Sequence, residues 1–234
     1  MKSSRLPGKV LKPILGKPML ELLIERIKQA RRVDRIVVAT TDSASDDPIE
    51  AWARRLDVGC FRGSEEDVLD RVLQAARQHA ADIIVEITAD CPLIEAEKID
   101  QMLASYQHMK CDMMMNRLDG TYPPGLGLRI FSRETLEKVN RLTQDPVDHE
   151  HVSLYVWEHP EIFSVYHFQN NLDPKYWNIR LTVDNQEDLI FIEEIFKELY
   201  ARNQGFDLYE IIDLLERRPE LMEINRHIQD KPIR

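Results

Sequence analysis

Apolar and polar residues alternate along this chain with two different spacings. Where apolar residues recur every three or four positions, as at Leu20, Leu23, Ile24 and Ile27, the spacing predicts helices. Short continuous runs rich in β-branched residues, as at 35–40, predict buried strands. Further strands are expected at 58–61, 82–88, 111–116, 128–131, 163–168 and 179–183. The predicted helices are those that begin near 47 and 68 and those at 18–31, 96–108, 132–142, 147–159 and 186–217, the last range containing two.

This alternation of strands and helices predicts an α/β fold with a mainly parallel sheet, because successive parallel strands need a crossover connection. The chain has 234 residues, no internal repeat and no linker-like stretch, so we expect a single domain over 1–234. A helical appendage is expected at its C-terminal end, over 203–234. In such sheets ligands bind beyond the carboxyl ends of the strands, and candidate chemistry is expected there.

Charge and cysteine content argue against several classes of protein. The formal net charge is −10, whereas a nucleic-acid-binding protein usually carries a positive surface that neutralises phosphates. No apolar run has the length of a membrane span. The three cysteines lack metal-ligand spacing and are expected to be reduced thiols of a cytoplasmic protein. We therefore expect neither a nucleic-acid nor a membrane partner.

The stretch SSRLPGK, residues 3–9, combines hydroxyls, cations, a proline and a glycine in one short loop. Arg5 can bind a phosphate through its planar fork and Lys9 as a point charge, and backbone N–H groups around Gly8 can add donors. The stretch is not the G-x-x-x-x-G-K-S/T phosphate loop, because it has one glycine and no hydroxyl residue after Lys9. A basic surface turn is the alternative interpretation.

Two aspartates, Asp90 and Asp184, each stand just beyond a predicted apolar strand. A carboxylate in such a position costs desolvation energy unless it is paired, hydrogen-bonded or bound to a cation. Two carboxylates that converge on one crevice suit Mg²⁺, which takes one or two of them and keeps phosphate oxygens and waters. The alternative for Asp184 is structural, as the cap of the helix that begins near Asn185. Together with a cationic loop, the two aspartates favour a magnesium site.

A second group of candidate residues lies on the predicted helix at 147–159. The HEH stretch at 149–151 lacks the HExxH spacing, and residues two apart on a helix face different sides, so a zinc site is not expected. His151 and Tyr155 are four apart and can line a pocket together, although a partly buried helix gives the same spacing. The stretch TYPPGLG at 121–127 is either a loop near a site or a crossover turn.

Seven segments resemble one protein family in the same order along the chain. They are SSRLPGKVL, ATTD, FRGSEEDVLDR, TADCPLI, TYPPGLG, DHEHVSLYV and IRLTVDNQEDL. The family is the acylneuraminate and KDO type of cytidylyltransferases, and within it the chain is nearest to the branch named for spore-coat polysaccharide biosynthesis. The resemblance implies a Rossmann-like nucleotide-diphospho-sugar transferase fold, which is a three-layer α/β sandwich. It also implies transfer of CMP from CTP to a sugar acid with release of pyrophosphate, dependent on Mg²⁺, in surface polysaccharide or glycan biosynthesis.

The same resemblance implies roles for individual residues. Those expected to bind CTP are Ser4, Arg5, Lys9, Thr41, Asp42 and Arg71. Those expected to ligate Mg²⁺ are Asp90 and Asp184, and those expected to act in catalysis are Lys9, Arg5 and Asp90. Those expected to bind the sugar acid are Tyr122, His151 and Tyr155. These roles agree with the chemistry, because in-line attack on the α-phosphorus needs positioning and charge neutralisation and no protein nucleophile.

The chain departs from the family pattern in its first residues. Family members begin with an apolar strand before the phosphate-binding loop, whereas here Met1 falls on the methionine inside that motif. The usual first strand is therefore expected to be missing, which leaves the neighbouring strands with unpaired backbone groups. An internal start site or a shortened chain is the simplest explanation.

Other departures involve charged and small residues. Glu86 stands where the spore-coat branch often has an arginine, and Arg129 stands where it has an acidic residue. If their strands are neighbours, this double reversal predicts an ion pair. Ala89 replaces the glycine of the usual TGD, and Gly127 replaces an aspartate, so the resemblance does not define which sugar acid is used.

Two other functions remain compatible with the residues. One is a glycosyltransferase of the same fold, although such enzymes usually carry a D-x-D metal motif that neither TADC nor TVDN supplies. The other is a shortened, inactive paralogue that acts as a subunit, against which the retained Arg5, Lys9, Asp90 and Asp184 argue. The expected partners are CTP and a small sugar acid, and the family suggests a homodimer.

Overall fold

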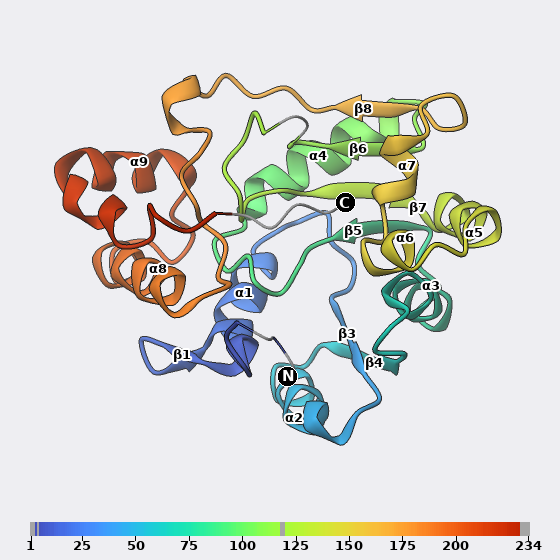
Figure 1. Cartoon of the computed structure of the whole chain (residues 1–234), viewed down its shortest axis with the longest axis horizontal. Helices are drawn as coiled ribbons and strands as arrows, with labels where there is room; N and C mark the ends of the chain where they lie inside the picture. The colour runs from blue at the N-terminus through green and yellow to red at the C-terminus, as the bar shows by residue number, and fades with distance from the viewer. Residues whose placement is uncertain (1–2, 4, 118–119, 230–234) are drawn as a thin grey trace.

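The computed structural model describes residues 3, 5–117 and 120–229, and it has an α/β architecture (Figure 1). The strands are β1 (Pro13–Ile14), β2 (Lys17–Pro18), β3 (Val37–Thr41), β4 (Gly59–Gly63), β5 (Ile83–Glu86), β6 (Met113–Met115), β7 (Arg129–Ser132) and β8 (Val165–His167). The α-helices are α1 (Met19–Ile27), α2 (Asp47–Arg55), α3 (Val68–Gln78), α4 (Ala96–His108), α5 (Arg133–Leu142), α6 (Pro146–Glu150), α7 (Leu154–Glu158), α8 (Gln186–Leu199) and α9 (Leu208–Arg217). The 3₁₀-helices are η1 (Lys9–Leu11), η2 (Ala44–Asp46), η3 (Pro174–Tyr176) and η4 (Pro219–Glu223).

Two sheets form the middle of the molecule, besides the short β1–β2 hairpin. β3 and β4 pair in parallel, with Val37 opposite Gly59 and Thr41 opposite Gly63. The larger sheet has the order β5-β7-β6-β8, in which β7 is antiparallel to both neighbours and β6 is parallel to β8. The described strands of these two sheets therefore form a mixed set of pairs, without the expected excess of parallel ones. Because β5, β6 and β8 run in the same direction, the loops that follow them share one edge of the sheet.

Helices cover both faces of the larger sheet, which gives three layers (Figure 1). On one face Met114 and Ile130 belong to an apolar cluster with residues of α1 and α4. On the other face the adjacent residues Met113 and Phe131 belong to a cluster with residues of α3, α5 and α7. Successive strand residues point to opposite faces, so a sheet covered on both sides must be apolar at consecutive positions. The continuous apolar runs of the sequence follow from this requirement.

Two of the predicted elements differ in the structure. The strand predicted at 179–183 is wrong: Leu181 N–H donates to Pro124 O (2.8 Å) and Val183 N–H donates to Asp90 O (2.9 Å), two bonds to different loops in place of a ladder. The helix predicted at 147–159 is divided into α6 and α7, because Val152 adopts a left-handed conformation with φ 39°. The other predicted strands and helices are present, with shifted ends.

β3 and β5 each have one paired edge among the described residues. β3 pairs with β4, and β5 pairs with β7. The open edges are incompletely covered, since the side chains of Val37, Val38 and Ala39 are half-buried and that of Ile83 is exposed.

The C-terminal helices share a core with the N-terminal segment. Leu208, Ile211 and Leu221 belong to the same apolar cluster as Leu6 and Ile14, together with much of α8. This packing places residues 5–9 beside the segment that precedes α8. Among the described residues, no helix is both long enough and apolar enough to cross a membrane.

The loop at 121–127 approaches the segment before Asp184 so closely that one position requires glycine. Gly125 has φ 98°, and a Cβ atom there would lie 2.2 Å from the backbone carbon of Leu181 and 2.5 Å from the nitrogen of Thr182. Backbone atoms cannot move aside as a side chain can. Gly120, in the preceding turn, has φ 75° but nothing within 4 Å of the corresponding position.

We expect Gly125→Ala to lower the free energy of unfolding by about 2–4 kcal/mol, because it combines backbone strain with a steric clash. Gly120→Ala is the matched control and should cost about 1 kcal/mol, since it has the strain alone. Urea unfolding followed by circular dichroism measures both losses. Equal losses in the two variants would contradict the close approach.

Candidate functional site

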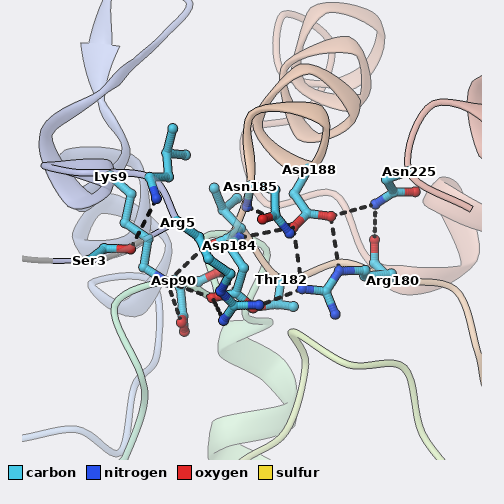
Figure 2. Close-up of polar contacts among 12 residues, drawn as sticks. Ser3, Arg5, Lys9, Asp90, Arg180, Thr182, Asp184, Asn185, Asp188 and Asn225 are labelled. Atoms are coloured by element: carbon cyan, nitrogen blue, oxygen red, sulfur yellow. Dashed lines mark hydrogen bonds and ion pairs between the residues drawn. The ribbon is translucent and has the colours of Figure 1, made fainter. Parts of the chain in front are cut away.

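Three segments that are distant in the sequence meet at the ammonium group of Lys9 (Figure 2). Lys9 Nζ donates to Asp90 Oδ2 and to Asp184 Oδ1, both at 2.8 Å, and to the carbonyl oxygen of Val183 at 2.9 Å. The side chains of Lys9 and Asp184 are only 15% and 14% exposed. Burial lowers the pKa of Lys9, but the two carboxylates outweigh it, and the pKa lies above its usual value. The lysine therefore remains an ammonium ion in the free protein.

Asp184 receives two further cations. Arg5 Nη2 and Arg180 Nη2 each lie 2.8 Å from one of its carboxylate oxygens. Burial raises the pKa of Asp184, but Lys9, Arg5 and Arg180 together hold that pKa below its usual value. The carboxylate is therefore ionised and fixed in orientation. The alternative that Asp184 caps α8 is wrong, because Asn185 is the N-cap of that helix.

The aspartate one turn further on, Asp188, supports this cluster from inside the core. Its side chain is fully buried and accepts hydrogen bonds from Arg180 Nε (2.9 Å) and from the backbone N–H groups of Asp184 and Asn185 (3.0 Å each). Asn225, from the C-terminal segment, donates to Asp188 Oδ1 (3.0 Å) and to Arg180 O (3.1 Å). A buried carboxylate needs several such partners to offset its lost hydration. The network holds both the backbone and the side chain of Asp184.

At the end of β3, the predicted nucleoside-binding residues are organised by a buried aspartate. Thr40 Oγ1 and Thr41 Oγ1 both donate to Asp46 Oδ2 at 2.8 Å, and Thr41 N–H donates to the same oxygen at 3.2 Å. Asp42 is exposed, and its backbone N–H donates to Gly63 O (2.9 Å). Asp46 thus fixes the turn that carries Thr41 and Asp42.

The predicted nucleotide-binding residue Arg71 lies on α3. It donates to the carbonyl oxygen of Ser64, and its Nε is buried without a hydrogen-bond partner among the described residues. Burial lowers the pKa of Arg71. Ser4, predicted to bind CTP, lies outside the described residues.

The predicted sugar-binding residues lie on different elements. His151 ends α6 and Tyr155 belongs to α7, so the expectation of one shared helix face is wrong. The ring of Tyr155 lies 4.0 Å from that of His159, centroid to centroid. Tyr122 is 2% exposed, and its hydroxyl donates to Glu95 Oε2 (3.1 Å), so this side chain supports the 121–127 loop from within the core.

The sequence of this chain is similar to a known protein family and to individual proteins over nearly its whole length. The sequence profile described as cytidylyltransferase matches residues 1–216. The chain belongs to the cytidylyltransferase family. It is 34% identical to protein MJ1063 of Methanocaldococcus jannaschii, over 99% of this chain and 93% of that protein. It is 30% identical to the spore coat polysaccharide biosynthesis protein SpsF of Bacillus subtilis, over 94% of this chain and 92% of that protein.

Solved structures of cytidylyltransferases share the fold. The structure of a cytidylyltransferase from Leptospira borgpetersenii has a TM-score of 0.90 and 31% identity, and the match covers 98% of this chain and 95% of that one. CMP:2-keto-3-deoxy-manno-octonic acid synthetase, solved in complex with CTP, has a TM-score of 0.61 and covers 84% of this chain and 94% of its own. At 19% identity this second likeness shows the fold alone. The family resemblance predicted from the seven segments is confirmed.

Sequence reasoning on this cytidylyltransferase missed three residues of the site network, Arg180, Asp188 and Asn225. Arg180 lies inside an apolar run and Asp188 inside an amphipathic helix, where a charged residue stands out once the run is known to be buried. No sequence pattern marks Asn225 as part of the site, because its hydrogen-bond partners, Arg180 and Asp188, lie far from it in the sequence. Asp46, which is the N-cap of α2, was also missed.

A buried histidine joins the α6–α7 region to the start of α3. His149 Nδ1 lies 2.8 Å from Asp67 Oδ1, and Nε2 lies 3.1 Å from Thr143 O. Both neighbours are acceptors, so only the doubly protonated ring satisfies both. Burial lowers the pKa of His149, but Asp67, Thr143 O and Asp148 outweigh it, and the pKa lies above its usual value.

We expect the His149 contact to stabilise the protein by about 1–3 kcal/mol at low pH. Because the folded pKa is raised, this contribution is complete below the unfolded pKa of about 6.5 and is lost as pH rises through the folded pKa. The unfolding free energies of the wild type and His149→Ala should therefore converge as the pH rises above about 6.5. His159→Ala, which removes the exposed ion pair with Glu161, is the control and should cost little at either pH. If the difference in unfolding free energy between the wild type and His149→Ala does not change with pH, the His149 ring is not charged in this contact.

Proposed function

We propose that this protein transfers CMP from CTP to a sugar acid, with release of pyrophosphate. The observation that carries the proposal is the convergence of Lys9 and Arg5 with Asp90 and Asp184 at one place. Family membership supports it, as does the fold shared with a synthetase solved with CTP. The relation to a spore coat polysaccharide biosynthesis protein supports a role in surface polysaccharide or glycan biosynthesis.

The residues present fit a divalent cation. Asp90 and Asp184 direct one carboxylate oxygen each at a common point, where the Lys9 ammonium lies 2.8 Å from both. Two carboxylates, completed by phosphate oxygens and waters, are a donor set that Mg²⁺ accepts. Asp90 and Asp184 would hold the ion, which when bound would neutralise charge on the triphosphate. Among the described residues there is no cluster of three or more acidic, histidine or cysteine side chains that would form a site of protein ligands alone.

The other residues of the proposed site would bind the two substrates and orient them for the reaction. Arg5 and Lys9 would bind the triphosphate, with Ser4 beside them in the sequence, and Thr41, Asp42 and Arg71 would contact the nucleoside. A hydroxyl of the sugar acid attacks the α-phosphorus in line, and the bond from that phosphorus to the bridging oxygen breaks as pyrophosphate leaves. The positive charges of Arg5 and Lys9 would stabilise the developing negative charge.

The sugar acid would bind beside the α6–α7 junction, near His151 and Tyr155, with Tyr122 supporting the neighbouring loop. A homodimer stays a prediction of the family resemblance. Mass measurement in solution, for example by light scattering, would test it.

We expect pyrophosphate release when the protein is given CTP, Mg²⁺ and a sugar acid such as KDO or N-acetylneuraminate. Asp90→Asn should lower kcat/KM by roughly 100-fold or more, because one charged ligand of the ion is lost. Asp82→Asn, at the exposed start of the same strand region, is the matched control and should behave as the wild type. Absence of CTP binding with Mg²⁺ would refute the proposed function, and full activity of Asp90→Asn would refute the metal assignment alone.

We also expect Lys9 to compete with the metal in the nucleotide-free protein, since its ammonium lies between the two carboxylates. Three cations (Lys9, Arg5, Arg180) balance three aspartates (Asp90, Asp184, Asp188), so a divalent ion alone would bring unbalanced charge. Titration with Mn²⁺, followed by electron paramagnetic resonance, should show weak binding that CTP strengthens.

The variant that tests this competition is Lys9→Met. It should bind Mn²⁺ without nucleotide about tenfold more tightly than the wild type, a difference of about 1.4 kcal/mol. Lys12→Met, on the next turn of the chain, is the control and should bind Mn²⁺ as the wild type does. Equal Mn²⁺ affinity in Lys9→Met and the wild type would contradict the competition.

A further inference from the structure

Glu86 and Arg129 form an incomplete ion pair across two adjacent strands. They are directly opposite each other on β5 and β7, and Arg129 Nη1 lies 3.8 Å from Glu86 Oε1. The ion pair predicted from the double charge reversal is therefore present, but at a distance too long for a hydrogen bond. Arg129 Nε and Glu86 Oε2 are both buried and have no hydrogen-bond partner among the described residues.

Unpaired polar atoms of this kind are costly. Each buried donor or acceptor left without a partner loses its hydration without compensation, and buried polar groups in native proteins are usually hydrogen-bonded. The Glu86 side chain is 12% exposed and that of Arg129 is 36% exposed, so the guanidinium is open to solvent on one side. A ligand that offered an acceptor to Arg129 and a donor to Glu86 would recover this cost.

The pair lies at the edge of the sheet where the metal-site aspartate follows β5. β5 ends at Glu86, β7 begins at Arg129, and β6 ends at Met115, which is paired with Arg129. Asp90 follows Glu86 by four residues, in the loop after β5.

The pair also faces the layer that carries the proposed sugar-binding residues. Side chains two positions apart on a strand share a face, so Glu86 points to the same side as Ile84, and Arg129 to the same side as Phe131. Ile84 and Phe131 pack in one apolar cluster with Val152 and with Tyr155, at the α6–α7 junction. The pair is therefore directed toward the side of the sheet that α3, α5 and α7 cover, where Tyr155 lies.

The charges at this edge distinguish Arg129 from its cationic neighbours. Lys9, Arg5 and Arg180 each lie 2.8 Å from an aspartate oxygen and are thus engaged by the metal-site cluster. Arg129 has one weak contact at 3.8 Å and retains hydrogen-bond donors. A guanidinium binds a carboxylate in two parallel hydrogen bonds, and an ionised glutamate accepts from a hydroxyl.

We propose that Arg129 and Glu86 bind the acid group of the substrate: Arg129 binds its carboxylate, and Glu86 accepts a hydrogen bond from a hydroxyl on a neighbouring carbon. The ligand class is thus a polyhydroxy carboxylate. This inference rests on the proposed function and extends it, because it assigns the acid recognition to two residues outside the Lys9 cluster. It requires that the pair contribute to sugar-acid binding and not to CTP binding.

The test compares the two substrates in one assay. In Arg129→Met the KM for KDO or N-acetylneuraminate in pyrophosphate release should rise at least about tenfold, with the KM for CTP unchanged. Arg129→Lys keeps the charge opposite Glu86 and loses the fork, so it should show a smaller rise in the same KM. Glu86→Gln should also raise the sugar-acid KM. Arg133→Met, at the other end of the same strand pair and beside Asp82, is the matched control and should leave both KM values unchanged.

Binding experiments separate this inference from the proposed function. Calorimetry of CTP with Mg²⁺ reports on the function, and calorimetry of KDO with the protein reports on the pair. Weaker KDO binding in both variants, with the larger loss in Arg129→Met and with CTP binding retained, supports the inference. It is overturned if both variants bind KDO as the wild type does, or if the KM values for CTP and sugar acid rise together. If Arg129→Met fails to fold, the result for Arg129→Lys tests the inference, because that variant keeps a cation opposite Glu86.

Discussion

The arrangement of this protein depends on one ammonium group shared between two carboxylates. Lys9 lies within 2.8 Å of both Asp90 and Asp184, and it thereby joins the N-terminal loop, the loop after β5 and the segment before α8. Each partner alone would be a poorly hydrated charge, so the three segments are stable in this position only together. The geometry that satisfies these charges in the free protein also brings a cationic loop and the carboxylates of Asp90 and Asp184 together at one edge of the sheet.

Support for that contact comes from elements that do not take part in it. Asp188 and Asn225 hold Arg180 and the backbone of Asp184, and the apolar cluster that contains Leu208 and Leu6 packs the C-terminal helices against the N-terminal segment. The C-terminal region therefore affects the site through the position of Asp184. A change in this distant packing would alter the site even though no residue of α9 contacts Lys9 by a hydrogen bond in the described chain.

The edge of the larger sheet carries two groups of charged residues, which differ in how completely their hydrogen bonds and ion pairs are formed. The cluster around Lys9 has balanced charges at hydrogen-bond distances, whereas Glu86 and Arg129 retain buried atoms without partners. Fully paired charges hold the segments in place. In our proposals, these paired charges belong to the triphosphate and metal site, and the incompletely paired ones bind the acid group of the sugar.

The sequence by itself determined the order of strands and helices, the α/β class, the family and the group of Arg5, Lys9, Asp90 and Asp184. These follow from local spacing and from motifs that are short and collinear. Tertiary structure decided the direction of β7, the lack of a strand at 179–183 and the break between α6 and α7 at Val152. It also decided the partners of Asp188 and Asn225. The reason is physical: apolar periodicity reports whether a segment is buried, while strand direction and the pairing of buried charges depend on neighbours that are remote in the sequence.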